Sequence, residues 1–191
     1  MKKAFSFFCA IILCISCKTA EFGTQCIDVN GMVYDFVNRP VSGYEIFAGE
    51  NHKTITDITG RFTLMNLPKG LYQIIGRCDN YESYSGILDL KDKKQIVYIR
   101  IPTSSQLLDL ADKSLTENRL EDAESYITRA EKTGRHITAE LAFYSAVLLF
   151  RKNNNTGAIE VLKYILSTGV DDSYVKNFLN VLEKNKGNFN E

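Results

Sequence analysis

Few side chains in this sequence have the types and spacing that catalysis or metal binding requires. The 191 residues include two histidines, His52 and His136, and both fall in polar turn segments. Histidines in such segments are usually solvated loop residues, because a histidine that acts as a general base needs an oriented partner and a pocket. The sequence contains no Gly-x-Ser-x-Gly, no His-Glu-x-x-His, no phosphate-binding glycine loop, and no Cys-x-x-Cys beyond residue 17. We therefore expect no catalytic residue, no metal site and no cofactor.

One turn-like segment has residues that could contribute to a calcium site. Asp57 follows Thr56 and is followed at a short distance by Gly60, so a carboxylate and backbone oxygens could meet there. Calcium takes six to eight oxygen ligands, and one carboxylate is too few for a tight site. We interpret the segment as a turn, in which the aspartate bonds its own downstream backbone and the glycine takes a positive φ.

The balance of charge argues against one class of partner. The sequence has 23 Lys+Arg and 23 Asp+Glu, so it lacks the concentrated basic field that binding a phosphate backbone requires. Its 45% hydrophobic and 24% charged residues are ordinary for a globular protein. We expect no nucleic-acid partner.

The amino terminus has the pattern of a targeting signal. Lys2 and Lys3 precede an apolar run over residues 4–16. A helix over that run would span about 20 Å, which is short of the roughly 30 Å of bilayer hydrocarbon. The pattern favours a cleaved signal peptide over residues 1–16, and a short uncleaved anchor is the alternative.

The end of this run carries a more specific pattern. Leu13-Cys14-Ile15-Ser16-Cys17 resembles the lipobox of bacterial lipoproteins, in which a small residue precedes the lipid-carrying cysteine. Cys14 departs from the pattern, because an aliphatic residue is usual there. The resemblance implies that Cys17 is acylated, with palmitate as one acyl group, and that residues 17–25 form a lipidated tether. Lys18 does not match the aspartate of an inner-membrane retention signal, so we expect anchoring at the outer membrane, on its periplasmic or its external face.

Two further cysteines remain in the predicted mature chain. Cys26 and Cys78 would lie in an oxidising compartment, where disulfides persist. A bridge between them would close a loop of about 50 residues and stabilise the fold by about 3–4 kcal/mol. The alternative is two separate buried thiols that act as small apolar residues.

Residues 26–102 read as a sandwich of about seven strands. Apolar residues alternate with a period near two, and turn residues interrupt them about every eight to twelve positions, which is typical of antiparallel sandwiches. The alternation places the following residues together in sets on one side of a strand: Tyr44, Ile46 and Ala48; Phe62 and Leu64; Tyr72, Ile74 and Gly76; Val97, Ile99 and Ile101.

Several spaced motifs in this region carry a family resemblance. They are Gly31 to Asp35, Arg39 to Ile46, Thr56 to Leu64, Leu67 to Tyr72, and Asn80-Tyr81. Together they resemble the carboxypeptidase-regulatory-like domain, a transthyretin-like β-sandwich. The resemblance implies a binding or spacer role without catalysis. An exposed aromatic platform, from Tyr81 and Tyr84, would favour an alternative in which the sandwich binds a glycan or a receptor.

After Pro102 the apolar period changes to about 3.6, which predicts helices over residues 104–186. Equivalent small residues recur 35 positions apart, as in Ala111 with Ala146 and Ala123 with Ala158. This spacing is similar to the tetratricopeptide repeat, although the family's tryptophan, first-helix glycine and final proline are missing. The alternative is an unrelated pair of helical hairpins. Two repeats are fewer than such stacks usually need, so we expect a fifth helix to cap one end and the sandwich to pack against the helices.

The repeat resemblance also implies a ligand-binding face on the first helix of each pair. Carried over residue by residue, this partner-binding groove consists of Leu108, Asp112, Leu115, Phe143, Val147, Phe150 and Arg151. Phe143, Val147 and Phe150 form one apolar stripe that could receive a peptide or helix. The alternative is that the stripe is core, packed on the fifth helix or on the sandwich.

Together these patterns predict an α+β, two-module chain. A seven-stranded antiparallel β-sandwich over 26–102 would be followed by an all-α helical-repeat module of about five helices over 104–186. The expected function is a non-catalytic, lipid-anchored interaction or scaffold module that binds a protein partner of the cell envelope. The alternative is an accessory binding lipoprotein of an outer-membrane uptake or secretion system.

Overall fold

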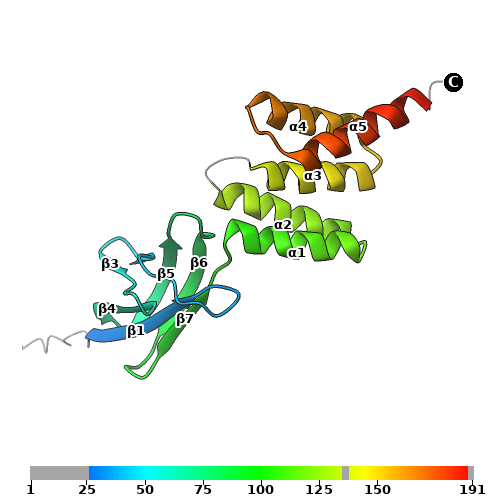
Figure 1. The fold of residues 1–191 in the computed structure, drawn as a ribbon. Helices are drawn as coiled ribbons and strands as arrows, with labels where there is room; N and C mark the ends of the chain where they lie inside the picture. Colours follow the sequence, from blue (N-terminus) through cyan, green and yellow to red (C-terminus); the bar gives the residue numbers. More distant parts are fainter. Residues whose placement is uncertain (1–25, 135–137, 189–191) are drawn as a thin grey trace, which may run out of the picture.

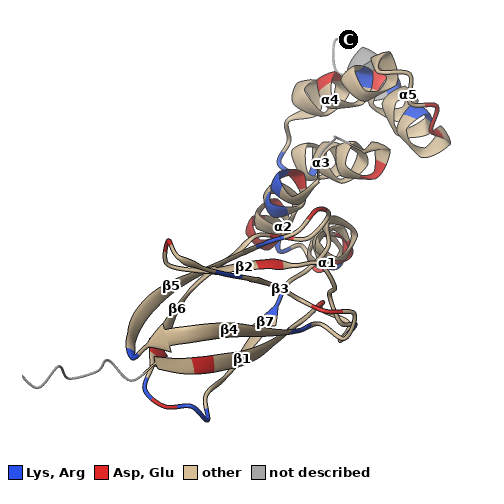
Figure 2. Cartoon of the chain, turned by 90° about the vertical axis from the view of Figure 1, so that its left-hand side faces the viewer, with Lys and Arg blue, Asp and Glu red and all other residues tan. Residues whose placement is uncertain are grey.

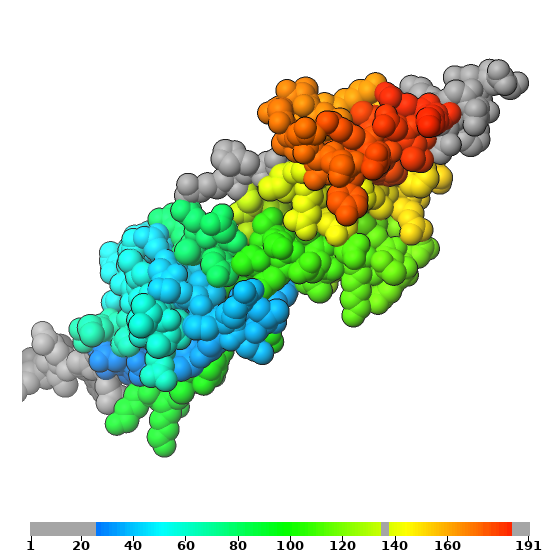
Figure 3. Space-filling view, in the orientation of Figure 1, coloured from blue at the N-terminus to red at the C-terminus, as the bar shows by residue number. Residues whose placement is uncertain are grey.

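The computed structural model describes residues 26–134 and 138–188. The predicted signal peptide, the tether, the acylation site Cys17 and His136 therefore lie outside the described residues. Seven strands in two sheets are followed by five packed helices, and the two parts lie end to end (Figure 1). The predicted α+β, two-module fold is confirmed. The space-filling view shows an elongated molecule with the strands at one end and the last helix near the other (Figure 3).

The strands form two layers that face each other (Figure 2). They are β1 (Cys26–Tyr34), β2 (Glu45–Ala48), β3 (His52–Ile55), β4 (Arg61–Pro68), β5 (Gly70–Arg77), β6 (Tyr84–Leu90) and β7 (Ile96–Arg100). One sheet has the order β4-β1-β7 and the other has the order β3-β2-β5-β6.

One pairing departs from the antiparallel prediction. β1 pairs with β7 in parallel, with Asn30 opposite Ile96 and Tyr34 opposite Arg100, whereas the other strand pairs are antiparallel. The chain leaves β6 in the four-stranded sheet and enters β7 in the other sheet. The direction of β7 is set by this crossing between layers, and a local hydrophobic period cannot specify it.

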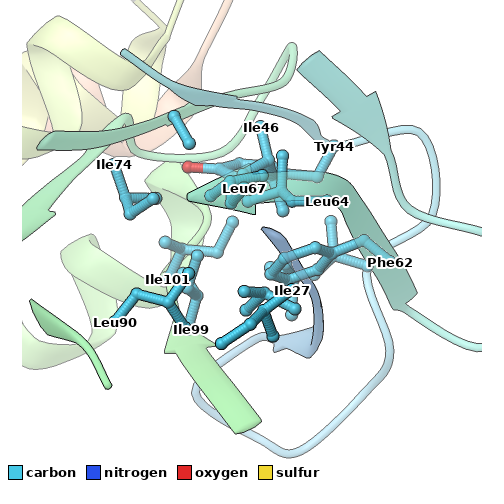
Figure 4. Close-up of a cluster of buried hydrophobic side chains, with 14 residues drawn as sticks. Ile27, Tyr44, Ile46, Phe62, Leu64, Leu67, Ile74, Leu90, Ile99 and Ile101 are labelled. Carbon is cyan, nitrogen blue, oxygen red and sulfur yellow. The ribbon is translucent and has the colours of Figure 1, made fainter. Parts of the chain in front are cut away.

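Alternate side chains from both sheets fill the space between the layers (Figure 4). Tyr44, Ile46 and Ala48 are all fully buried, as their period-two spacing predicts. Burying a large apolar side chain contributes about 1.5–3 kcal/mol, so this cluster is the main stabilising feature of the sandwich. Its labelled members in Figure 4 are Ile27, Tyr44, Ile46, Phe62, Leu64, Leu67, Ile74, Leu90, Ile99 and Ile101.

The segment around Asp57 is the turn that the sequence predicts. Asp57 Oδ1 accepts hydrogen bonds from the Thr59 amide at 2.7 Å and the Arg61 amide at 3.0 Å, and Gly60 has φ 75°. The Thr59 hydroxyl and these amides hold the pKa of Asp57 below its usual value. The carboxylate is thus used to fix the turn.

The helices are α1 (Ser104–Thr116), α2 (Leu120–Thr133), α3 (Ala139–Arg151), α4 (Asn155–Ser167) and α5 (Ser173–Asn188). Thr138 caps α3 through its side chain, which accepts from the Leu141 amide at 3.1 Å, and Asp172 accepts from the Val175 amide at 3.0 Å at the start of α5. Hydroxyl and carboxylate side chains are preferred at this position, because their oxygens accept from the free amides of the first turn. None of the helices in the described ranges is long and apolar enough to cross a bilayer.

The helices repeat their geometry at the predicted offset. α1 and α3 begin 35 residues apart, and so do α2 and α4. Asn118 and Asn153, also 35 apart, both take left-handed φ values, 56° and 62°, in the turns within each pair. Ala111 and Ala146 are fully buried, which lets neighbouring helix backbones approach closely. α1 contacts α3, and α3 contacts α5, so these three helices lie side by side.

Candidate interaction surface

The face formed by α1, α3 and α5 contains the predicted groove, but its members have different environments. Asp112 and Arg151 are exposed, and Phe150 is 40% exposed. Leu108 and Leu115 are 2% and 4% exposed. The prediction that these two leucines line an open groove is wrong, because both are packed into the core between α1, α2 and α3.

The apolar stripe on α3 is divided between two neighbours. Phe143 and Phe150 both pack edge-to-face on Phe178 of α5, with ring centroids 5.7 Å and 6.0 Å apart, and Val147 packs against the α1–α2 cluster. Edge-to-face pairs add about 0.5–1.5 kcal/mol beyond area burial. The stripe is therefore half-buried: Phe143 and Phe150 pack on the fifth helix, which agrees in part with the alternative interpretation, and Phe150 extends the stripe to the surface.

Carboxylates border this face on α1 and α3. Burial raises the pKa of Glu140, and the negative charge of Asp109 raises it further. Burial also raises the pKa of the nearby Tyr144 hydroxyl, and Asp112, Glu140 and Asp109 add to the effect. Asp109, Asp112 and Glu140 thus all act on the Tyr144 hydroxyl, from α1 and from α3. They give the α1–α3 face a negative field around Tyr144.

A polar junction holds the helices against the end of the sandwich. Asp35, 1% exposed, accepts a hydrogen bond from Gln106 Nε2 at 2.9 Å. Gln106 Oε1 in turn accepts from the Thr103 amide at 3.2 Å, while the Thr103 hydroxyl accepts from the Gln106 amide at 3.1 Å. These two reciprocal bonds form a capping box. The Gln106 side chain therefore both caps the start of α1 and links this helix to the sandwich.

A second contact of the junction is ionic. Arg129 on α2 donates two hydrogen bonds to the Glu82 carboxylate, at 2.7 Å and 2.8 Å. The Glu82 amide donates to the Pro102 carbonyl at 2.9 Å, and its own carbonyl accepts from the Tyr44 hydroxyl at 3.0 Å. Glu82 therefore connects α2, the inter-module segment and the sandwich core. The expectation that the two parts pack together holds, although they meet end-on and through polar groups.

Sequence reasoning missed these junction residues. The Thr103-x-x-Gln106 spacing is a recognisable capping-box signal and could have placed the start of α1. Glu82 and Arg129 are 47 residues apart, and no local pattern indicates that they meet.

The histidine and the cysteine that could have carried chemistry lie in environments that favour a structural role. His52 packs edge-to-face on Tyr72 at a centroid distance of 6.4 Å. Burial raises the pKa of the Cys78 thiol, and the charge of Asp79 raises it further, which favours the protonated, weakly nucleophilic form. Within the described ranges, no group of three or more His, Cys, Asp or Glu side chains could hold a metal ion.

The two cysteines lie at opposite ends of the sandwich. Cys26 begins β1 opposite Pro68, and Cys78 follows the far end of β5. The eight residues of β5 span roughly 26 Å, whereas a disulfide needs Cα atoms within about 7 Å. The structure therefore excludes the predicted bridge and leaves the alternative of two separate thiols, although Cys26 is exposed rather than buried.

Tyr81 and Tyr84 do not form an exposed platform. Both are half-buried and pack against the sandwich core. The feature that would have favoured glycan binding is therefore absent at this pair.

Comparisons with known proteins find similarity in fold only. Neither a model of a known protein family nor a curated protein sequence matches the chain. A type II cohesin–X-dockerin complex from Acetivibrio cellulolyticus is similar at 14% identity and a TM-score of 0.36, over 42% of this chain and 60% of that one. The Caf1A usher C-terminal domain is similar at 18% identity and a TM-score of 0.30, over 40% of this chain and 97% of that one.

An enzyme is among the similar structures as well. The 3-chlorocatechol 1,2-dioxygenase from Rhodococcus opacus 1CP is similar at 14% identity and a TM-score of 0.34, over 44% of this chain and 62% of that one. The matches thus cover less than two thirds of the cohesin-complex and dioxygenase chains. At this identity nothing that these proteins bind or catalyse follows for this chain.

Proposed function

We propose that this chain is a non-catalytic, lipid-anchored protein of the cell envelope whose helices present a binding face to a protein partner. The observation that carries the proposal is the side-by-side packing of α1, α3 and α5, which presents their outer sides as one continuous face. The sandwich acts as a spacer, because Cys26 and the junction with α1 lie at opposite ends of it.

Two resemblances support this proposal in finer detail. The 35-residue offset of the helix pairs and the left-handed Asn118 and Asn153 fit a tetratricopeptide-like stack, with α5 as its capping helix. Such stacks bind protein segments on the first helix of each pair. The strand motifs fit a carboxypeptidase-regulatory-like spacer.

The partner-binding face that we propose consists of exposed and half-exposed groups. Asp109, Asp112 and Glu140 supply charge, and Tyr144 and Phe150 supply apolar area. Aromatic side chains beside charged groups are enriched where proteins bind one another. The partner is a protein of the same envelope, and the lipid on Cys17 holds the two together at the outer membrane.

The anchor is tested by replacing Cys17 with alanine. We expect this change to abolish incorporation of radioactive palmitate and to release the protein from the membrane fraction, because two or more acyl chains supply the membrane affinity. Cys26→Ala serves as the matched control and should retain both label and location. Label that persists in the Cys17→Ala protein would refute the anchor.

The binding face is tested by photo-crosslinking in the native envelope. We expect a photoreactive residue at Asp112, on the α1–α3–α5 face, to form an adduct with one protein, and a residue at Glu121 on α2 to form none. Phe150→Asp should remove the Asp112 adduct, because it places a charge in the apolar part of the face. An adduct formed instead from Ile87, which is 73% exposed on the sandwich, would place the partner on the strands.

A further inference from the structure

The end of the sandwich where β1 begins carries a group of lysines. Gly70 pairs with Leu90, and Cys26 pairs with Pro68, so the turn at Lys69 and the loop after Leu90 lie beside the entry of the chain. A hollow of about 540 Å³ at this end is lined by Cys26, Ile27, Asp28, Lys69, Asp92 and Lys93. Figure 2 shows basic residues in the turn and the loop at this end.

The three carboxylates at this end have partners of their own, but among the residues that the structure describes only Asp89 is neutralised by an ion pair. Asp89 forms an ion pair with Lys91 at 2.8 Å. Asp92 accepts a hydrogen bond from the Lys94 amide at 2.7 Å, and Asp28 accepts one from the Asn66 amide at 2.9 Å.

Three lysines at this end, Lys69, Lys93 and Lys94, form no ion pair with any residue that the structure describes. All three are exposed, so their ammonium groups remain available to an anionic surface.

The length of chain before Cys26 limits how far this end can lie from a membrane. Residues 17–25, between the proposed acylation site and β1, reach at most about 30 Å when extended. The nine residues of β1 add roughly 30 Å before the helices begin. The lysine end therefore stays within about 30 Å of the proposed acylation site, which is close enough for it to reach the surface.

We propose that Lys69, Lys93 and Lys94 bind the anionic headgroups of the membrane that carries the lipid anchor. This inference rests on the proposed function, because the anchor brings the lysines to the surface. Each lysine near an anionic surface favours the bound state by about fivefold. Three of them hold the sandwich upright on the bilayer, with the helices pointing away from it.

Energy transfer between the protein and vesicle headgroups tests this orientation. Cys78→Ser leaves Cys26 as the remaining thiol of the acylated chain, and a donor dye on Cys26 reports its distance from an acceptor on the headgroups. We expect stronger transfer in phosphatidylcholine vesicles with about a third phosphatidylglycerol than in pure phosphatidylcholine. The difference should vanish near 1 M salt, where the Debye length is about 3 Å.

Charge reversal identifies the residues. Lys93→Glu with Lys94→Glu should reduce the surface-bound population by more than about tenfold in the anionic vesicles. Lys113→Glu with Lys184→Glu makes the same change of charge on α1 and α5 and should have no effect. Both pairs are exposed, so neither should alter the melting temperature.

Two different failures can be told apart. A protein that stays on the vesicles but gives equal transfer with neutral and anionic lipid overturns this inference and leaves the anchor intact. A protein that binds neither kind of vesicle overturns the anchor, and the upright orientation falls with it.

Discussion

Replacing Asp35 by alanine is expected to lower the free energy of unfolding by about 3–4 kcal/mol, because a buried charge-assisted network loses its acceptor. The carboxylate accepts from the amides of Val37 and Arg39 at 2.9 and 2.8 Å, from Arg39 Nε at 2.9 Å and from Gln106 Nε2 at 2.9 Å. Urea unfolding followed by circular dichroism measures the loss. Gln106→Ala, which removes only the contact with α1, should cost about 1–2 kcal/mol.

The control for Asp35 is a carboxylate in a comparable turn. Asp57 also bonds its own downstream amides, but it is exposed and does not touch the helices, so Asp57→Ala should cost clearly less. A loss in Asp57→Ala equal to that in Asp35→Ala would show that the turn, and not the junction, is what Asp35 stabilises.

Acid should remove the same contribution. Burial raises the pKa of Asp35, but the hydrogen bonds from Arg39, Gln106 and Val37 outweigh it and hold the pKa below its usual value. A lowered folded-state pKa contributes stability above the unfolded value, near 3.9, and this contribution is lost as pH falls through the folded value. The difference between the wild type and Asp35→Ala should therefore be full at neutral pH and shrink below about pH 4.

Replacing Tyr44 by alanine should cost about 4 kcal/mol, because it empties a large site in the centre of the sandwich. Tyr44 is fully buried, and its ring occupies the space left open by Gly76, where an added Cβ would lie 2.3 Å from Tyr44 Cε1. Burial raises the pKa of Tyr44 well above its usual value, so the hydroxyl remains a donor to the Glu82 carbonyl at neutral pH.

Tyr44→Phe separates the ring from the hydroxyl. This variant keeps the packing and loses one hydrogen bond, so we expect a cost of about 1–2 kcal/mol in the same urea experiment. If Tyr44→Phe were as unstable as Tyr44→Ala, the bond to Glu82 rather than the filled core would be the main contribution of this residue.

The sequence predicted the features that depend on local spacing. The period of two placed Tyr44, Ile46 and Ala48 in the core, and the spacing of Asp57 and Gly60 marked a turn. These predictions succeed because a period or a turn is determined within a few residues.

The features that the sequence did not predict depend on which surfaces meet. A helical stripe shows that one side of α1 is apolar, but it does not show whether Leu108 and Leu115 meet solvent or α2 and α3. The separation of Cys26 from Cys78 follows from the direction of β5. The contact of Glu82 with Arg129 follows from the way α2 returns toward the sandwich, and no short pattern encodes that distance in space.

The parallel pairing of β1 with β7 has a mechanical consequence. The predicted anchor precedes the first residue of β1, and α1 follows the end of β7, so a pull between the membrane and the helices acts on opposite ends of the two strands. Force applied in this way runs along the strands and shears their interstrand hydrogen bonds together instead of opening them one at a time. If the proposed anchor and partner hold the two ends of the chain, the crossing between layers that reverses β7 places a pair of strands loaded in shear between them.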